Sequence, residues 1–149
     1  MDIETTRFGN ITIEDDKILS FSDGLPGFED CKQFVLLAAE ETGMMHWLQA
    51  VEQPEVSLCV LDVFRGIPDY SPDIPDEVFA ELEATESDLV VLSVLVVPPS
   101  ITDMTTNLIA PILINHQNNR GKQCILEKGD YSARHRVFSD LQELISQEA

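Results

Sequence analysis

The chain has 149 residues, 44% of them hydrophobic, which is typical of one globular domain and excludes a disordered tail, a collagen or a membrane protein. Nine Lys and Arg residues stand against 27 Asp and Glu residues, so the formal net charge is −18. A field of that sign repels phosphate backbones, which disfavours direct nucleic-acid binding and favours a basic partner.

Short β-type segments separated by turns occupy the first part of the chain. Residues 11–13 and 17–21 alternate apolar and polar side chains on either side of an Asp-Asp pair, which predicts a hairpin. In the sequence Gly24-Leu25-Pro26-Gly27-Phe28, Pro26 before Gly27 is typical of a type II turn, because Pro pre-sets φ and Gly accepts a positive φ. Further strands are predicted over residues 34–39, 46–52 and 57–64.

Two later segments are strongly apolar. Residues 89–97 form a nearly unbroken apolar run, which predicts a strand that is buried on both faces, as in a sandwich or a tightly closed barrel. Residues 107–115 contain Pro111, which cannot donate a ladder hydrogen bond and predicts a strand that is irregular at its middle. A turn at residues 118–121 then leads to a last strand at residues 122–127.

Helical signals are sparse. Residues 75–84 start with a proline and two acidic residues and carry a narrow apolar stripe, which predicts a short helix. A second short helix is predicted from Ser139, where Ser139 and Gln142 would form a capping box. Its apolar face would consist of Leu141, Leu144 and Ile145.

These elements predict an all-β, mainly antiparallel fold. We expect a small barrel-like or sandwich-like single domain with two short peripheral helices. The β domain would span residues 1–138, and residues 139–149 would form a short C-terminal helix or tail. No internal repeat or linker indicates a second domain.

Residues that could carry chemistry are scattered. The cysteines are odd in number and lack CxxC spacing, which argues against a disulfide framework or zinc site and fits a reduced cytoplasmic setting: Cys31, Cys59 and Cys124. The histidines lie far apart: His46, His116 and His135. Nucleophile and phosphate-loop motifs do not occur, and the N-terminus does not resemble a signal peptide. We therefore expect a cytoplasmic protein that is not an enzyme and needs no cofactor or metal.

The negative charge is unevenly distributed along the chain. Residues 1–119 carry 22 acidic and four basic side chains, whereas residues 120–149 carry five of each. The segment from Arg120 to Arg136 is locally basic. We favour an intramolecular role for these cations, as salt-bridge partners of the acidic body, over a ligand site.

The densest acidic segment is residues 69–88, which contain eight carboxylates and no base. Such a segment is either a solvated helix face or a docking surface for a cationic protein, and the sequence leaves both interpretations open. Apolar residues within it suit the second, because apolar anchors ringed by charge are typical of binding hot spots: Tyr70, Ile74 and Phe79.

Several segments resemble the flagellar assembly factor FliW family. They are Thr6-Arg7-Phe8-Gly9, the stretch from Phe21 to Glu29 that contains GLPGF, Trp47-Leu48-Gln49, and the stretch from Asp103 to Asn115 that contains TTNLIAPILIN. The likeness runs over residues 5–136 in the family's order. Ser22 replaces a Pro that the family often has, and the tail after Phe138 matches nothing diagnostic.

The resemblance implies a non-enzymatic bacterial protein with two mutually exclusive partners, flagellin and the RNA-binding translational regulator CsrA. Once flagellin is exported, the freed chain would bind CsrA away from its RNA-contacting surface and relieve repression of flagellin translation. One alternative is a dedicated flagellin chaperone without CsrA antagonism, whose strand edges pair with flagellin. A small β-barrel enzyme or metal-binding domain is a less favoured third hypothesis.

The expected CsrA-facing surface is the acidic segment. Its candidate residues are Tyr70, Asp73, Asp76, Glu77, Phe79 and Glu83. An anionic body held beside the RNA site of CsrA would repel phosphates within about a Debye length, ~8 Å at physiological salt.

Other candidate contacts follow from the family-like segments. Phe28, Leu48 and Gln49 are expected at an exposed or grooved surface, with Trp47 in the core. Further polar candidates occur near Pro111: Asp103, Thr105, Asn107 and Asn115. For these we favour hydrogen bonds to the irregular backbone around Pro111 over direct partner contact.

Overall fold

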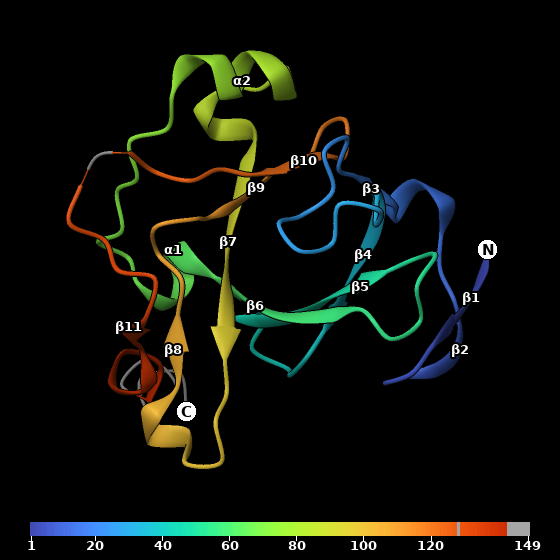
Figure 1. Cartoon of the computed structure of the whole chain (residues 1–149), viewed down its shortest axis with the longest axis horizontal. Coiled ribbons are helices and arrows are strands. Elements are labelled where there is room, and N and C mark those ends of the chain that lie inside the picture. Colours follow the sequence, from blue (N-terminus) through green and yellow to red (C-terminus); the bar gives the residue numbers. More distant parts are fainter. Residues whose placement is uncertain (128, 143–149) are drawn as a thin grey trace.

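The fold is a closed β-barrel with small additions outside it. The computed structural model describes residues 1–127 and 129–142. Within them, seven strands close into a barrel in the order β7-β6-β5-β4-β3-β10-β9, and β9 pairs back onto β7 (Figure 1). The pairings are antiparallel except β3 with β10. Their bounds are β3 Leu19–Ser20, β4 Gln33–Ala38, β5 Met45–Ala50, β6 Ser57–Asp62, β7 Leu89–Val96, β9 Ile112–Asn115 and β10 Arg120–Gln123. The predicted all-β, single-domain fold is confirmed.

Smaller elements decorate the barrel. The other strands are β1 Asp2–Thr5 with β2 Gly9–Thr12 as a separate hairpin, and β8 Thr105–Thr106 with β11 His135–Arg136 beside the far end of β7. The helical segments are η1 Asp15–Lys17, α1 Val63–Gly66, α2 Asp76–Leu82, η2 Glu86–Asp88 and η3 Ile101–Asp103. None of the helices in the described part of the chain has the length and apolar character needed to cross a membrane.

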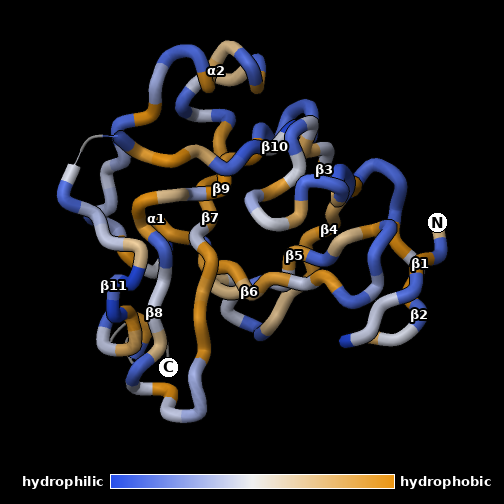
Figure 2. Tube along the Cα trace, in the orientation of Figure 1, coloured by the Kyte–Doolittle hydropathy of each residue, from blue (hydrophilic) through white to orange (hydrophobic). Residues whose placement is uncertain are grey.

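The barrel is apolar inside and is also covered by apolar residues outside, which explains the nearly unbroken apolar run of β7. Leu92 points into the barrel and packs with Phe21 and Phe34. Its neighbour Val91 points outward and packs under Val78 of α2. Because successive side chains of a strand alternate in direction, both faces of β7 are buried at its middle, as predicted. The prediction is wrong for the end of the run, where Val96 and Val97 are exposed. Figure 2 shows this apolar character along β7 and the strands beside it.

The hairpin predicted over residues 11–21 is wrong. β2 pairs with β1, as in the register Ile3 with Ile11, whereas Leu19 of β3 pairs with Phe34 of β4. The helical turn η1 separates the two strands and carries the chain from the outer hairpin into the barrel wall. Ile3 and Ile13 are buried against the outside of β4, so packing, not the local pattern, selects the partner.

The turn and strand predictions around the prolines hold in outline. The amide of Phe28 donates to the carbonyl of Leu25 at 2.7 Å and Gly27 has φ 86°, as a type II turn requires. Regular strand geometry begins only after Pro111, at β9, so residues 107–111 are irregular as expected. The strand predicted over 122–127 instead covers Arg120–Gln123.

The C-terminal helix begins earlier than predicted. Its described part starts at residue 138, and the amide of Leu141 donates to the carbonyl of Val137 at 3.1 Å. Ser139 therefore lies inside the helix, which is inconsistent with the predicted capping box. Leu144 and Ile145 lie outside the described residues.

Asn115 fastens α2 to the barrel. Its side chain is 1% exposed, and its amide nitrogen donates to the carbonyls of Leu82 at 2.9 Å and Glu83 at 3.1 Å. We expect Asn115→Ala to lower the free energy of unfolding by about 1–3 kcal/mol, because the carbonyl of Glu83 loses its side-chain donor and that of Leu82 keeps only the bond from Asn118. Asn10→Ala, at an exposed site, should change it by less than about 0.5 kcal/mol. Urea denaturation measures both, and equal effects would contradict the role of Asn115.

The turn between β4 and β5 is organised by Glu40. Burial raises the pKa of this carboxyl, but the Thr42 hydroxyl and the amides of Met45, Thr42 and Met44 donate to it and hold its pKa below the ordinary 4.5. The stability it contributes is thus complete above that ordinary value and is lost as the pH falls through the lower folded-state pKa.

We expect Glu40→Gln to lower the free energy of unfolding by about 1–2 kcal/mol at pH 7, and by progressively less as the pH falls. Protonation also relieves repulsion among the other carboxylates of this acidic chain, so the quantity to follow is the difference between the two proteins. Urea unfolding at several pH values from 7 to 3 provides it. A difference that stays constant over this range would rule out the carboxylate as the source.

Candidate protein-interaction surfaces

The acidic segment surrounds a pocket of about 360 Å³ that is lined by both apolar and polar residues. Its less exposed lining residues include Tyr70, Ile74, Leu89 and Val91. Two more accessible rings also line it: Phe64 is 44% exposed and Phe79 is half-buried. Asp73 and Glu86 contribute carboxylates to the same pocket. The arrangement offers an apolar side chain a socket within a negative field.

Three of the eight carboxylates in this segment have internal partners. Glu81 accepts from Lys122 at 2.6 Å, and Glu83 pairs with Arg120 at 3.2 Å. Asp88 accepts hydrogen bonds from the amide and hydroxyl of Thr85, which lower its pKa. The other five are exposed and form what we call the acidic face: Asp69, Asp73, Asp76, Glu77 and Glu86.

Tyr70 is not the exposed anchor that was predicted. It is only 4% exposed, its hydroxyl donates to the carbonyl of Leu108 at 2.6 Å, and its ring packs against Tyr131 with centroids 4.6 Å apart. Burial raises its pKa far above the usual range. Phe64 takes the exposed position instead. The sequence signal for this exposure was the charged residue Arg65, which directly follows Phe64 at the end of the strand predicted over 57–64. In the structure the chain forms a helical turn there.

Leu48 and Gln49 are also wrong as surface candidates, because both are fully buried. Leu48 points into the barrel, and the Gln49 amide on the opposite face donates to the carbonyls of Ala50 and Pro54. Trp47, expected in the core, is half-buried with the Arg7 guanidinium 3.8 Å from its ring centroid. Closure of the barrel decides all three positions.

Phe28 lies where the sequence predicted, on a grooved surface. The groove has a volume of about 680 Å³, and its apolar lining includes Phe28, Leu58, Val94, Val96 and Pro98. Phe28 is 36% exposed and Val96 is 60% exposed. We call this surface the Phe28 groove. Val96 was missed because it continues a strand whose preceding residues are buried.

The polar candidates near the Phe28 groove divide between structural roles. The Asn107 side-chain oxygen accepts hydrogen bonds from the amides of Ile109 and Ala110. This confirms the prediction that Asn107 bonds to the irregular backbone before Pro111. Asp103 does not serve that backbone, because it pairs with Arg136 at 2.8 Å. The path of β11 brings Arg136 beside it, a proximity that the local sequence does not reveal.

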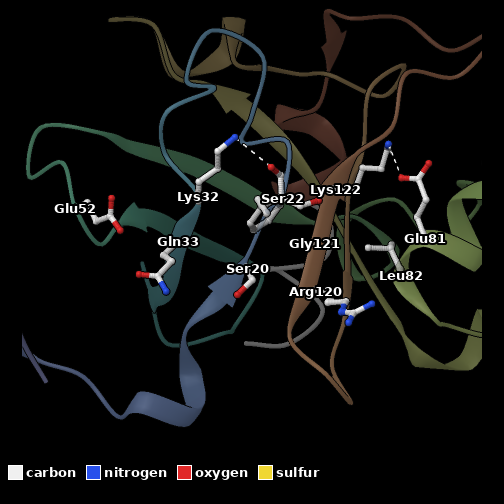
Figure 3. A pocket seen from close by; sticks show the side chains of 11 residues that line it. Ser20, Ser22, Lys32, Gln33, Glu52, Glu81, Leu82, Arg120, Gly121 and Lys122 are labelled. Carbon is white, nitrogen blue, oxygen red and sulfur yellow. Dashed lines mark hydrogen bonds and ion pairs between the residues drawn. The ribbon is translucent and has the colours of Figure 1, made fainter.

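A third cavity, of about 620 Å³, contains basic residues from the predicted cationic strip (Figure 3). Lys122 binds Glu81 and also approaches Asp23 at 3.5 Å, and the hydrogen bond to Glu81 raises its pKa. Lys32 donates to the carbonyl of Ser22 at 3.1 Å. Arg120 is held by Glu83. The intramolecular role predicted for the strip is confirmed for Arg120, Lys122 and Arg136.

The described residues contain no group of three or more His, Cys, Asp or Glu side chains arranged to hold a metal ion. Cys31, Cys59 and Cys124 are free thiols, and burial raises the pKa of each. Thiols of that kind are poor nucleophiles at neutral pH. The notable surfaces are therefore the acidic face with its pocket and the Phe28 groove.

Comparison with known proteins identifies the family. Residues 2–137 match the FliW protein family. The chain belongs to this family. It is 40% identical over 141 residues to the flagellar assembly factor FliW of Desulfitobacterium hafniense strain Y51, a match that covers 94% of this chain and 93% of that one. It is 39% identical over 139 residues to the flagellar assembly factor FliW of Thermotoga sp. strain RQ2, which covers 92% and 93%.

The FliW fold agrees as well. A crystal structure of the flagellar assembly factor FliW superimposes with a TM-score of 0.86 and 37% identity, covering 93% of this chain and 97% of that chain. The resemblance based on GLPGF and TTNLIAPILIN is thus confirmed, and the chain is a member of a family of flagellar assembly factors. The acidic face and the Phe28 groove both lie within the matched residues.

Proposed function

We propose that this FliW-family chain binds the translational regulator CsrA and antagonises its repression of flagellin translation, with flagellin as a mutually exclusive partner. The observation that carries the proposal is the acidic face around the pocket that Phe64 and Phe79 line. Of the predicted contact residues, Asp73, Asp76, Glu77 and Phe79 remain CsrA-facing candidates. Glu83 is held by Arg120 and contributes to the field from there.

The physical basis is electrostatic. A protein that binds RNA is basic where the RNA lies, and the positive potential extends to the surface beside that site. This neighbouring surface is attracted to five exposed carboxylates for which no described residue supplies a cation. Complementary charge of this kind raises the association rate and orients the partners. The pocket between Phe64 and Phe79 would then receive an apolar side chain, which supplies affinity that salt does not screen. Bound in this way, the anionic body would lower the potential at the RNA site.

The proposal includes a non-enzymatic mode of action in the cytoplasm. Residues 1–138 would act as the binding domain, with residues 139–149 as a short helix or tail. Phe28 remains a candidate contact residue, because the groove that it lines is apolar and accessible. Asp103 and Asn107 would act indirectly, by holding the polar side of that groove in place.

A titration of the purified chain with CsrA, followed by calorimetry, tests the proposal. We expect saturable binding that weakens with added salt, release of flagellin mRNA from CsrA, and competition by purified flagellin. Absence of a complex with CsrA would refute the antagonist function.

The second candidate function is a dedicated flagellin chaperone, which the accessible apolar Phe28 groove supports. A sizing column distinguishes the two functions. Only the antagonist forms a complex with CsrA, whereas both hypotheses allow a complex with flagellin.

A further inference from the structure

The barrel is closed, but β4 extends past its short neighbour β3 and leaves part of one edge unpaired. β3 is only two residues long, and Leu19 and Ser20 pair with Phe34 and Gln33 at the start of β4. Before Leu19 the chain coils into η1 and leaves the sheet. The rest of β4, from Val35 onward, therefore pairs with β5 on one side and with no described strand on the other.

The backbone groups that face this open edge can be identified from the ladder. The amide of Val51 donates to the carbonyl of Gln33 at 2.9 Å, and the amide of Ala39 donates to the carbonyl of Met45 at 3.1 Å. Odd-numbered residues of β4 therefore bond to β5, and even-numbered residues point the other way. The N–H and C=O groups of Leu36 and Ala38 face the open edge, and no described residue bonds to them.

A groove runs along the same edge. It has a volume of about 510 Å³, and its apolar lining comprises Ile13, Leu19, Val35, Leu36 and Leu37. Neighbouring strands lie about 4.8 Å apart, so a strand added here would bond to Leu36 and Ala38 and turn alternate side chains toward the apolar lining.

The charges beside the groove indicate what would occupy it. Glu14 lines the groove, Asp16 follows in η1, and Glu41 follows the far end of β4. All three are exposed. Within the lining Lys17 balances Glu14, so the negative charge comes from Asp16 and Glu41, which lie outside the lining. A second copy of this chain is disfavoured, because it would bring the same carboxylates and its own net charge of −18 to the contact.

We propose that the open edge of β4 accepts an extended segment of a partner protein as an added strand, and that this segment alternates apolar residues between basic flanks. The main-chain bonds to Leu36 and Ala38 would supply affinity, and the groove and its carboxylates would supply selectivity. This inference goes beyond the proposed function, because the groove shares no lining residue with the pocket in the acidic segment.

A synthetic peptide with the central sequence Val-Thr-Val-Thr-Val between pairs of lysines is the probe. Amide hydrogen exchange of the full chain, followed by NMR, is the readout. At saturating peptide, exchange at Leu36 and Ala38 should slow by about tenfold or more. Val35 and Leu37, which already bond to β5, serve as internal controls and should change little.

Modified peptides test the mode of binding. Methylation of the peptide nitrogens that face β4 should abolish the protection, whereas methylation of the alternate set should be tolerated. Replacing the flanking lysines by glutamates should weaken binding at least severalfold. Equal binding by both methylated forms, or no protection at Leu36 and Ala38, would overturn the proposal.

A variant tests the edge from the side of the protein. Ala38→Pro removes the outward N–H but leaves the bonds of Leu37 and Ala39 to β5, and it should abolish peptide binding. Unchanged peptide affinity in this variant would also overturn the proposal. If the variant does not fold, the methylated peptides still test strand addition on the unaltered chain. CsrA titration of the same protein is a separate readout, so failure of one proposal is distinguishable from failure of the other.

Discussion

Replacing Asp73 and Asp76 by Asn and Glu77 by Gln is expected to weaken CsrA binding by about tenfold, since three exposed charges at about 0.2–1 kcal/mol each amount to that order. The loss should fall mainly on the association rate, because rim charges steer the encounter more than they hold the complex. All three side chains are exposed and pair with no cation among the described residues, so the variant should fold like the parent chain. Calorimetry at low and physiological salt measures the effect, which should shrink as salt is added.

A matched variant separates position from net charge. Replacing Glu4, Glu52 and Glu55 by Gln removes the same total charge from exposed sites outside the acidic face. We expect this variant to bind CsrA within about twofold of the parent, because distant exposed charges are screened. Equal weakening by both triple variants would mean that CsrA senses only the overall charge, which would eliminate the acidic face as a docking site.

Phe21→Ala is expected to lower the free energy of unfolding by about 3–5 kcal/mol, the largest stability effect that we predict. The Phe21 side chain is 0% exposed, and its ring meets that of Phe34 edge-on with centroids 5.3 Å apart. Gly121 lies directly against the ring, because a Cβ at that position would be 2.4 Å from the nearest ring carbon. Removing the ring would leave a cavity where β3, β4 and β10 meet.

Urea denaturation measures this loss. Phe8→Ala is the control, because Phe8 is half-buried beside Trp47 outside the barrel. This substitution should lower the free energy of unfolding distinctly less than Phe21→Ala. Gly121→Ala should also destabilise the chain by about 1–3 kcal/mol through overpacking. Combining it with Phe21→Leu should recover part of that loss. Additive effects of these two substitutions would contradict direct contact between the positions.

Much of the fold follows from local sequence. The type II turn at Pro26 and Gly27 depends on the φ preferences of two adjacent residues, so it is readable from them alone. The apolar run in β7 predicts burial on both faces, because a strand alternates direction at every residue. The family-like segments likewise identify the FliW fold without knowledge of any contact.

Other features depend on contacts between distant segments. The partner of β2 is selected by packing of Ile3 and Ile13 on the outside of β4, which the alternating pattern near residue 13 does not encode. Leu48 and Gln49 are buried because β5 lies between β4 and β6 with apolar cover on both faces. Tyr70 is buried because it packs with residues far along the chain, among them Tyr131, and its hydroxyl donates to a carbonyl 38 residues away.

The charge of the chain depends both on the local sequence and on contacts between distant segments. The sequence by itself determined the all-β class, the net charge of −18 and the concentration of carboxylates at residues 69–88. Only the tertiary structure decided which of them are available to a partner. Lys122 pairs with Glu81 and Arg120 pairs with Glu83, whereas the acidic face remains exposed. The physical reason is that Coulomb energy depends on distance in space, and cations about 40 residues away along the chain come within 4 Å only when the barrel closes.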